Sequence, residues 1–168
     1  MMSPIKRFAG IVSLISSRIG MLAITILLFL TVGDVLGRYA FNAPIPGTYE
    51  LTKILFALSV FFSLPVSQFN GENLGITLLY DRFPLKVKGI LDLMSALISI
   101  TVFIVGFSQT LKYAARMKNA HTVTSVLRLP MHPWIYIASI GILCLIAVLL
   151  WDLAVSIKEL LGRDGNES

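Results

Sequence analysis

The chain has 168 residues, of which 56% are hydrophobic and only 14% are charged, and its formal net charge is +5. A soluble domain carries about 25% charged residues, which hydrate its surface. The composition therefore excludes an ordinary soluble globule and indicates a protein whose outer surface faces lipid.

Four long segments without a charged side chain follow one another along the chain, at residues 19–33, 54–71, 93–111 and 129–151. A bilayer core of about 30 Å needs about 20 helical residues, and a segment in lipid must satisfy its own backbone hydrogen bonds. We therefore expect an all-α integral membrane protein with four transmembrane helices in a single membrane domain, residues 1–168. The expected spans are residues 16–37, 50–69, 89–111 and 133–155, with short cytoplasmic tails outside them.

The basic residues Lys6, Arg7 and Arg18 precede the first apolar segment, as they do in a signal peptide. No cleavage site of small residues follows the segment, so we interpret it as an uncleaved signal anchor with a cytoplasmic N-terminus. Four spans then place the C-terminus in the cytoplasm as well. This orientation leaves eight of the 14 basic residues inside and six outside, a weak bias that keeps an inverted topology as the alternative.

Turn-forming residues delimit the first two helices. Pro44 and Pro46 end the first helix, Gly47 permits a turn, and Thr48 is the predicted N-cap of the second helix. Pro65 lies inside the second span, where we expect it to kink the helix.

Three charged residues lie close together at the first connection and form a predicted structural cluster of this hairpin. Asp34 and Arg38 are four residues apart and share a helix face, and Glu50 follows just beyond the prolines. We expect Arg38 to bridge the two carboxylates. The alternative is an arginine that faces solvent or lipid headgroups, because exposed ion pairs contribute only about 0–1 kcal/mol.

The fourth span carries two tryptophans and the only cysteine. Trp134 and Trp151 are 17 residues apart in the sequence, which is about 25 Å along a helix, so we expect them to mark the two membrane interfaces. The alternative is that both rings simply pack against neighbouring helices. Cys144 lies between them and is expected to be a small apolar filler, since one cysteine forms no intrachain disulfide.

Residues with catalytic or metal-binding chemistry are sparse. His121 and His132 fall in one connection, with no carboxylate or cysteine near them in the sequence, and no ionisable residue lies in the middle of a span. Span hydroxyls such as that of Ser59 are expected to bond to carbonyls of their own helix. We therefore expect no enzyme activity, no cofactor, no metal ion and no nucleic-acid partner in this chain. Because no ionisable residue lies in the middle of a span, we also expect that the chain does not perform ion-coupled transport by itself.

Several sequence blocks occur in an order that is typical of a known family. They are GRYAFNAPIPGTYEL at residues 37–51, FSLPVSQFNGE at 62–72, RFP at 82–84, TSVLRLPMHPW at 124–134, and Gly141. With these blocks the chain resembles the small membrane (permease) subunit of tripartite ATP-independent periplasmic (TRAP) transporters, the DctQ-type family, over about residues 20–155. It departs from the family at residues 73–77, where NLGIT replaces a usual His-Val-x-Val-Asp, so no ligand or proton role transfers to Asn73 or Thr77.

The resemblance implies a scaffold subunit in the cytoplasmic (inner) membrane of a bacterium or archaeon. Its partners would be a large permease subunit, which holds the solute and sodium ions, a periplasmic solute-binding protein, and membrane lipids. The transported solute would be an organic anion of the carboxylate type. The alternatives are an independent four-helix transporter or channel, and a structural anchor of another membrane complex.

The resemblance also suggests a role for the basic third connection. Lys112, Arg116, Lys118 and Arg128 lie there without a neighbouring acidic residue, although the expected orientation places them outside. We expect this group to attract an acidic patch of the binding protein. The alternative is contact with anionic lipid headgroups. For the contact with a partner helix we consider the closely spaced Gly33 and Gly37, whose alternative role is a flexible helix end.

Overall fold

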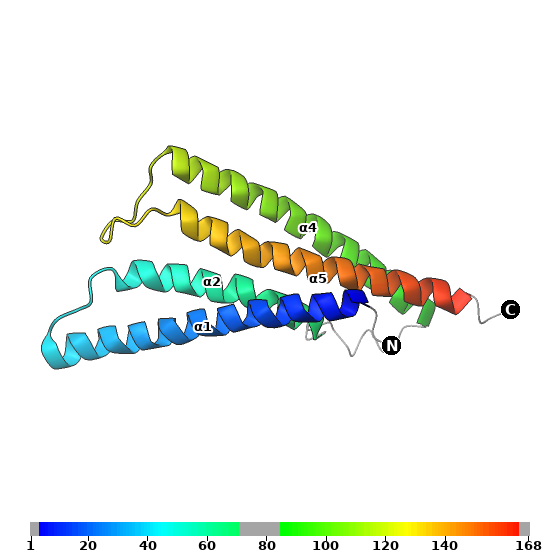
Figure 1. Cartoon of the computed structure of the whole chain (residues 1–168), viewed down its shortest axis with the longest axis horizontal. Coiled ribbons are helices and arrows are strands. Elements are labelled where there is room, and N and C mark those ends of the chain that lie inside the picture. Colours follow the sequence, from blue (N-terminus) through cyan, green and yellow to red (C-terminus); the bar gives the residue numbers. More distant parts are fainter. Residues whose placement is uncertain (1–3, 71–84, 165–168) are drawn as a thin grey trace.

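The computed structural model describes residues 4–70 and 85–164, and these residues form four long helices and no strand (Figure 1). The helices are α1 (Pro4–Phe41), α2 (Thr48–Phe69), α4 (Leu85–Asn119) and α5 (His132–Asp164). All four are long and apolar enough to cross a membrane. The prediction of an all-α protein with four transmembrane helices is therefore confirmed. The block at 82–84 and the departure at 73–77 lie outside the described residues.

Three of the helices are longer than a bilayer core requires. α1 has 38 residues, α4 has 35 and α5 has 33, whereas about 20 residues cross the hydrocarbon. Each expected span lies inside one helix. α1 and α4 continue past the charges at both ends of their uncharged segments, and α5 continues past Asp152 at its end. The helices continue because lysine and arginine are good helix formers, so charge marks the edge of the lipid rather than the end of the helix.

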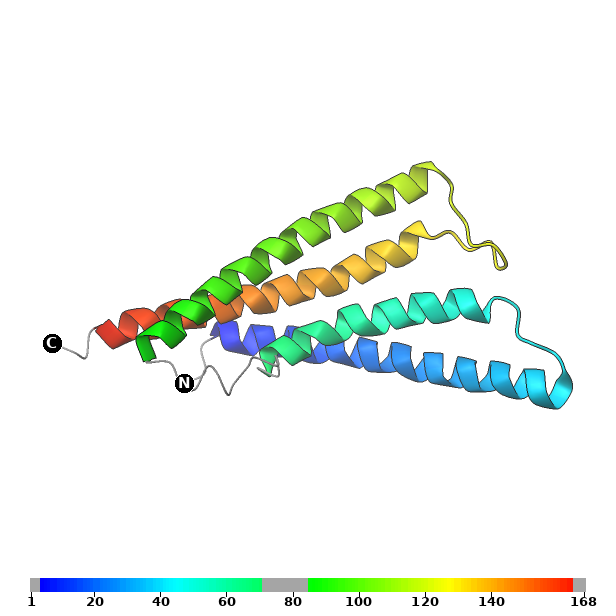
Figure 2. The same cartoon turned by 180° about the vertical axis from the view of Figure 1, so that it is seen from behind.

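The helices form a row rather than a closed bundle. α1 packs on α2, α2 on α5, and α5 on α4, and α1 also contacts α5. Two hairpins, α1–α2 and α4–α5, come together at the end that carries both chain termini, and they diverge toward the other end (Figures 1 and 2). We call this other end the loop end; it contains the connections at residues 42–47 and 120–131. Both termini thus lie on one side, and which side is cytoplasmic stays a prediction.

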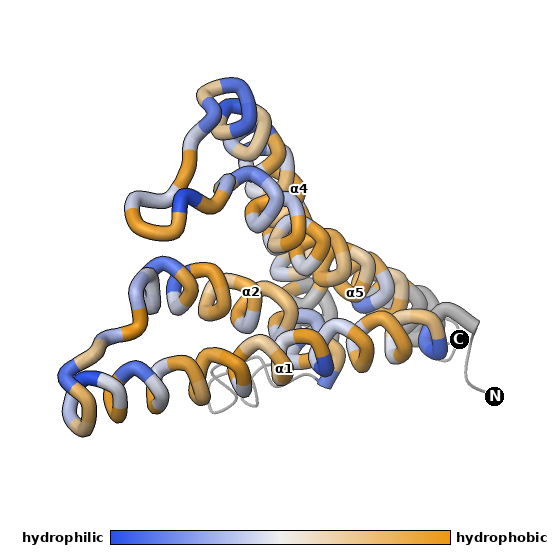
Figure 3. The backbone as a smooth tube through the Cα atoms, turned by 60° about the vertical axis from the view of Figure 1, so that its left-hand side comes forward, coloured by the Kyte–Doolittle hydropathy of each residue, from blue (hydrophilic) through white to orange (hydrophobic). Residues whose placement is uncertain are grey.

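α5 is an inner helix of the row that contacts all three of the others, α4, α2 and α1. Its residues Leu145, Val148 and Leu149 are buried, and two of them form a core cluster with Ile100 of α4. The outer faces of α1 and α4 expose large apolar side chains such as Phe29 and Ile98. Hydrophobic residues dominate the helices, and hydrophilic ones gather near the loop end (Figure 3). The exposed apolar faces are what lipid or an apolar partner would cover.

Small residues allow α1 to approach α2 closely. Ser13, Ser16, Gly20 and Ala23 are buried along one face of α1. The Ser16 hydroxyl donates a hydrogen bond of 2.7 Å to the carbonyl of Phe62 in α2. In lipid no hydrophobic force drives helices together. Small residues let the two backbones approach closely, and the resulting van der Waals contacts hold the helices together.

Pro65 interrupts the hydrogen bonding of α2 in its interior. Proline has no N–H, so the carbonyl four residues earlier, that of Phe61, lacks its usual helical donor. Gly141 of α5 lies directly against this carbonyl: a Cβ atom at position 141 would lie 2.8 Å from the Phe61 oxygen. The break in α2 is therefore covered by the backbone of α5, next to the carbonyl that Ser16 of α1 binds.

Candidate functional site: the loop end

The polar side chains that carry the predicted functions gather at the loop end. Within residues 4–70 and 85–164, no group of three or more histidine, cysteine, aspartate or glutamate residues could hold a metal ion. Hydroxyls of Ser59 and Thr101 bond within their own helices, as predicted, to the carbonyls of Phe56 and Leu97, whereas that of Ser16 bonds to the neighbouring helix α2.

The first connection folds back on the end of α1. Asn42 has a left-handed backbone (φ 50°), and the amide of Ala43 donates to the carbonyl of Gly37 over 3.0 Å. A Cβ atom at position 37 would lie 2.7 Å from the Ala43 oxygen, and one at position 33 would meet the side chain of Ile45. Gly37, one of the two glycines considered for a partner helix, thus makes room for the chain's own connection, whereas a side chain at position 33 would only be in ordinary contact with Ile45.

Asp34 is the anchor of this connection. One of its carboxylate oxygens accepts the Nε–H of Arg38 at 2.8 Å, and the other accepts the backbone amide of Ile45 at 2.9 Å. Asp34 is only 6% exposed, whereas the side chain of Arg38 is 58% exposed. A carboxylate with both oxygens engaged fixes the connection to the last turns of α1.

Glu50 has a different partner from the one expected. Its Oε1 accepts the amide of Val126 at 2.8 Å and its Oε2 accepts the amide of Leu127 at 3.0 Å. Both Glu50 and Arg38 lie within the described residues, and no ion pair joins them. The expected bridge by Arg38 therefore holds for Asp34 only. The physical reason is that two adjacent amides offer one donor to each oxygen, and the guanidinium is already bound to Asp34.

The connection that contacts Glu50 is itself a compact structure. The amide of Thr124 donates to the carbonyl of Leu129 at 3.0 Å, and the amide of Leu129 donates to the Thr124 hydroxyl at 3.1 Å. An isolated antiparallel bridge joins Val123 and Pro130 just outside this ring, and Arg128 has a left-handed backbone (φ 53°). We call residues 124–129 the tip loop.

Leu127 adds an apolar contact to the same attachment. Its side chain lies over Gly47, and a Cβ atom at that position would overlap it. Gly47 also has a left-handed backbone (φ 79°) and occupies the N-cap position of α2. The prediction of Thr48 as the N-cap was therefore wrong: Thr48 is the first helical residue, and its hydroxyl donates to the carbonyl of Ile45. We call the contacts of Glu50 and Gly47 with the tip loop the clamp.

The clamp joins the two hairpins, and sequence reasoning did not find it. Glu50 and Val126 are 76 residues apart, and no spacing rule links a carboxylate to backbone amides at that distance. The only signal was composition, because Glu50 lies in the first turn of α2 where an acidic side chain is favoured. A second missed contact joins the hairpins near the other end, where Gln68 donates to Asp152 at 3.1 Å.

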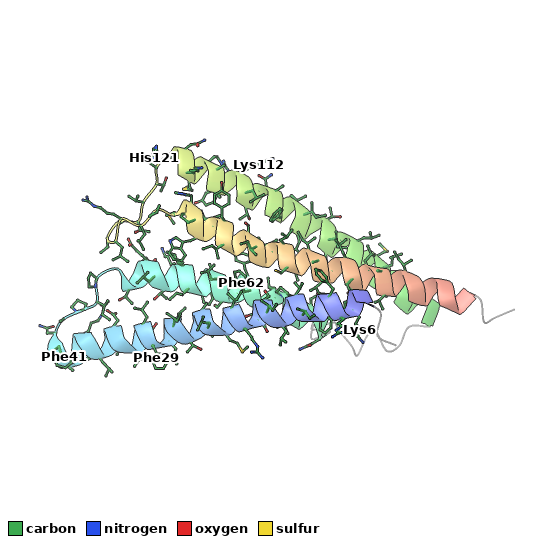
Figure 4. The ribbon with its side chains drawn as sticks, viewed as in Figure 1. Lys6, Phe29, Phe41, Phe62, Lys112 and His121 are labelled. Atoms are coloured by element: carbon green, nitrogen blue, oxygen red, sulfur yellow. The ribbon has the colours of Figure 1, made fainter. Side chains whose placement is uncertain are left out.

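The basic residues of the loop end are exposed. These are Lys112, Arg116 and Lys118 near the end of α4 and Arg128 in the tip loop; Figure 4 shows Lys112 on α4 and His121 just beyond this helix. Residues 34–53 and 112–134 contain six basic and two acidic residues, a formal charge of 6 − 2 = +4. Both acidic residues, Asp34 and Glu50, are bonded to other groups of the chain, and the net charge of the loop end is positive.

The two tryptophans contact neighbouring helices. Trp134 is partly buried against the core cluster of Ala23, Leu58, Phe62 and Ala138. Trp151 lies with its ring centre 5.0 Å from that of Phe69, and its Nε1 is buried without a hydrogen-bond partner in the described part of the chain. These contacts are those of the alternative that the sequence left open, and the position of the rings relative to the membrane stays a prediction.

Comparison with known proteins adds one match. The family model described as Tripartite ATP-independent periplasmic transporters, DctQ component, matches residues 27–159. No curated protein and no solved structure matches the chain. The matched range contains the whole loop end, including Asp34, the clamp and the basic residues.

Proposed function

Since the chain belongs to the DctQ component family of TRAP transporters, we propose that it acts as the scaffold on which a large permease subunit performs solute uptake. Membership of this family makes it a transporter component of the inner membrane, the small subunit of a TRAP transporter. In the proposal, the large subunit carries the solute, an organic anion of the carboxylate type, and the sodium ions that drive its uptake. A periplasmic binding protein delivers the solute.

The observation that carries the scaffold role is the arrangement of the helices in a row. α2 and α5 each pack between two other helices, whereas α1 and α4 leave their outer faces to the surroundings. The middle of each long uncharged segment contains no aspartate, glutamate, lysine, arginine or histidine that could couple solute movement to an ion. A row of helices offers a broad apolar surface to a membrane partner, and this supports a structural part in transport.

The proposal assigns the loop end to the periplasm and to the binding protein. The exposed cations Lys112, Arg116, Lys118 and Arg128 would attract an acidic patch and raise the rate of encounter. This role is supported by the net positive charge of the loop end, whose two carboxylates are bonded to other groups of the chain. Replacement of Lys112, Arg116 and Lys118 by glutamine should raise the half-saturating concentration of binding protein, and high ionic strength should shrink this difference.

Reconstitution tests the function as a whole. Liposomes that contain this chain and its large partner should take up the solute when the binding protein and an inward sodium gradient are both present. Liposomes that contain this chain with the binding protein, but without the large partner, should take up none. Uptake by the chain alone would instead identify an independent four-helix transporter, and normal uptake by the large subunit alone would remove the proposed scaffold role.

A further inference from the structure

We propose that Glu50 is a positioning residue for the binding protein: it holds the tip loop so that Val126 and Arg128 form a preformed docking surface. The inference rests on the proposed function, since it names the part of the loop end that the binding protein contacts. Two sequence blocks, at residues 37–51 and 124–134, meet at this point although they lie on different hairpins.

The clamp fixes both the position and the direction of the tip loop. Each oxygen of Glu50 accepts one of two successive amides, those of Val126 and Leu127, so the peptide plane between them cannot turn without losing a bond. The side chain of Leu127 is directed at Gly47 and completes the attachment. Together with the hydrogen bonds that close the ring between Thr124 and Leu129, these contacts leave the tip loop little freedom.

The same contacts determine which side chains the tip loop exposes. Leu127 is directed inward, and Val126 on one side of it is 59% exposed. Arg128 on the other side is exposed and has a left-handed backbone. Val123, at the base of the loop, is 50% exposed. The surface therefore offers apolar side chains beside a cation in a fixed geometry.

Charge indicates an acidic protein surface as the occupant. Among the described residues, the loop end carries six basic and two acidic side chains, and the two carboxylates are already bound, Asp34 to Arg38 and Ile45 and Glu50 to the tip loop. Binding of anionic lipid headgroups would require only the positive charge of the loop end. A protein partner gains in addition from fixed backbone geometry and exposed apolar side chains, since a preformed surface lowers the entropic cost of association. The structure of the tip loop therefore favours a protein over a lipid surface.

The experiment uses the full transporter in liposomes, with the binding protein varied in concentration. The variant is Glu50→Gln, which keeps the shape of the side chain but removes its charge and one acceptor oxygen. The matched control is Asp34→Asn, which alters the other amide-binding carboxylate of the loop end. We expect Glu50→Gln to raise the half-saturating concentration of binding protein by roughly three- to tenfold, with a smaller change in maximal rate, and Asp34→Asn to leave it unchanged.

Amide hydrogen exchange gives a second readout that does not involve transport. Exchange at Val126 and Leu127 should be faster in Glu50→Gln and unchanged in Asp34→Asn, because only the former loses the clamp. Faster exchange with an unchanged half-saturating concentration would overturn the inference and leave the proposed function standing. Wild-type uptake that is independent of the binding protein would instead overturn the proposed function itself.

Two further measurements cover other outcomes. If Glu50→Gln does not assemble with the large subunit, Val126→Asp and Arg128→Gln decide the question, since both change the exposed tip without touching the clamp. Both should raise the half-saturating concentration, and an unchanged value in both would overturn the inference. A half-saturating concentration that follows the anionic lipid content of the vesicles, and not these substitutions, would assign the surface to lipid and would also overturn it.

Discussion

Two carboxylates at the loop end, those of Asp34 and Glu50, each attach a different connection to the helices. Asp34 and Glu50 each accept at least one backbone amide, but Asp34 binds the connection of its own hairpin and Glu50 binds the tip loop of the other hairpin. In each case the carboxylate accepts a backbone amide of an irregular connection, where no helical carbonyl is available to accept it. The difference in partner decides which mutation affects one hairpin and which affects the contact between the two.

The first residue-scale prediction concerns Arg38 and its partners. In double-mutant cycles on the thermal stability of the purified protein, Arg38→Ala and Asp34→Ala should be non-additive, with a coupling of about 0.2–1 kcal/mol as for other partly exposed pairs. Arg38→Ala and Glu50→Ala should be additive, because the two side chains bind different groups. Coupling between Arg38 and Glu50 of similar size would contradict the arrangement described here.

The second residue-scale prediction concerns Gly47. Alanine at this position should destabilise the protein by about 1–3 kcal/mol, because its Cβ would overlap Leu127 and because a positive φ is unfavourable for alanine. Gly106→Ala is the matched control, since a Cβ atom at position 106 meets nothing within 4 Å. Thermal unfolding of both variants in detergent measures the difference, and an equal effect of the two would show that Leu127 does not need the space.

Local rules predicted one of these carboxylate contacts and missed the other. Asp34 and Arg38 are four residues apart on a helix, so the helical repeat alone brings them together. The bonds of Glu50 depend on how the second hairpin packs and on a left-handed residue in the tip loop, neither of which follows from neighbouring sequence. The N-cap of α2 was misassigned for a similar reason, because Leu127 on a distant connection takes part in selecting glycine at position 47.

At the scale of the elements, the helices themselves were predictable and their lateral order was not. Long uncharged segments set the number and type of the helices, because lipid leaves few other solutions for a backbone. The row in which α5 separates α2 from α4 depends on side-chain fit instead. Gly141 illustrates the difference: the sequence shows a glycine in an apolar span, and only the structure shows that it lies on the Phe61 carbonyl that Pro65 leaves without a helical donor.

The element-scale prediction tests this contact. Gly141→Val should separate α2 from α5 and lower the unfolding temperature of the isolated subunit, because the added atoms would meet backbone that cannot move aside. Overpacking of this kind costs about 1–3 kcal/mol. Gly106→Val introduces the same side chain on α4 in open space and serves as the control. A variant at position 141 as stable as that at position 106 would exclude a close approach of the two helices.

At the scale of the whole molecule, the structure places the two termini at one end and the two connections of the loop end at the opposite end. The assignment of those ends to cytoplasm and periplasm depends on the basic N-terminal residues and on the weak charge bias of the chain. The proposed docking surface requires the loop end to be periplasmic. Orientation is therefore the property on which the functional proposals depend most directly.

Thiol labelling in whole cells tests the orientation. In a Cys144→Ala background, a cysteine at Asn119, at the loop end of α4, should react with a membrane-impermeant reagent added from outside. A cysteine at Lys86, near the opposite end of α4, should react only after the cells are opened. The reverse pattern would place the loop end in the cytoplasm and would exclude a meeting with a periplasmic protein.

The clamp also has a mechanical consequence. The two hairpins lean away from each other toward the loop end, and the 120–131 connection reaches from one to the start of α2 in the other (Figure 1). The two hairpins and the tip loop form a triangle. The hairpins meet at the end that carries the termini, and the tip loop connects them across the open end. A triangle, unlike a hinged pair of arms, cannot open without stretching a side. A load that pushed α1 and α4 apart at the loop end would therefore act on the hydrogen bonds of Glu50.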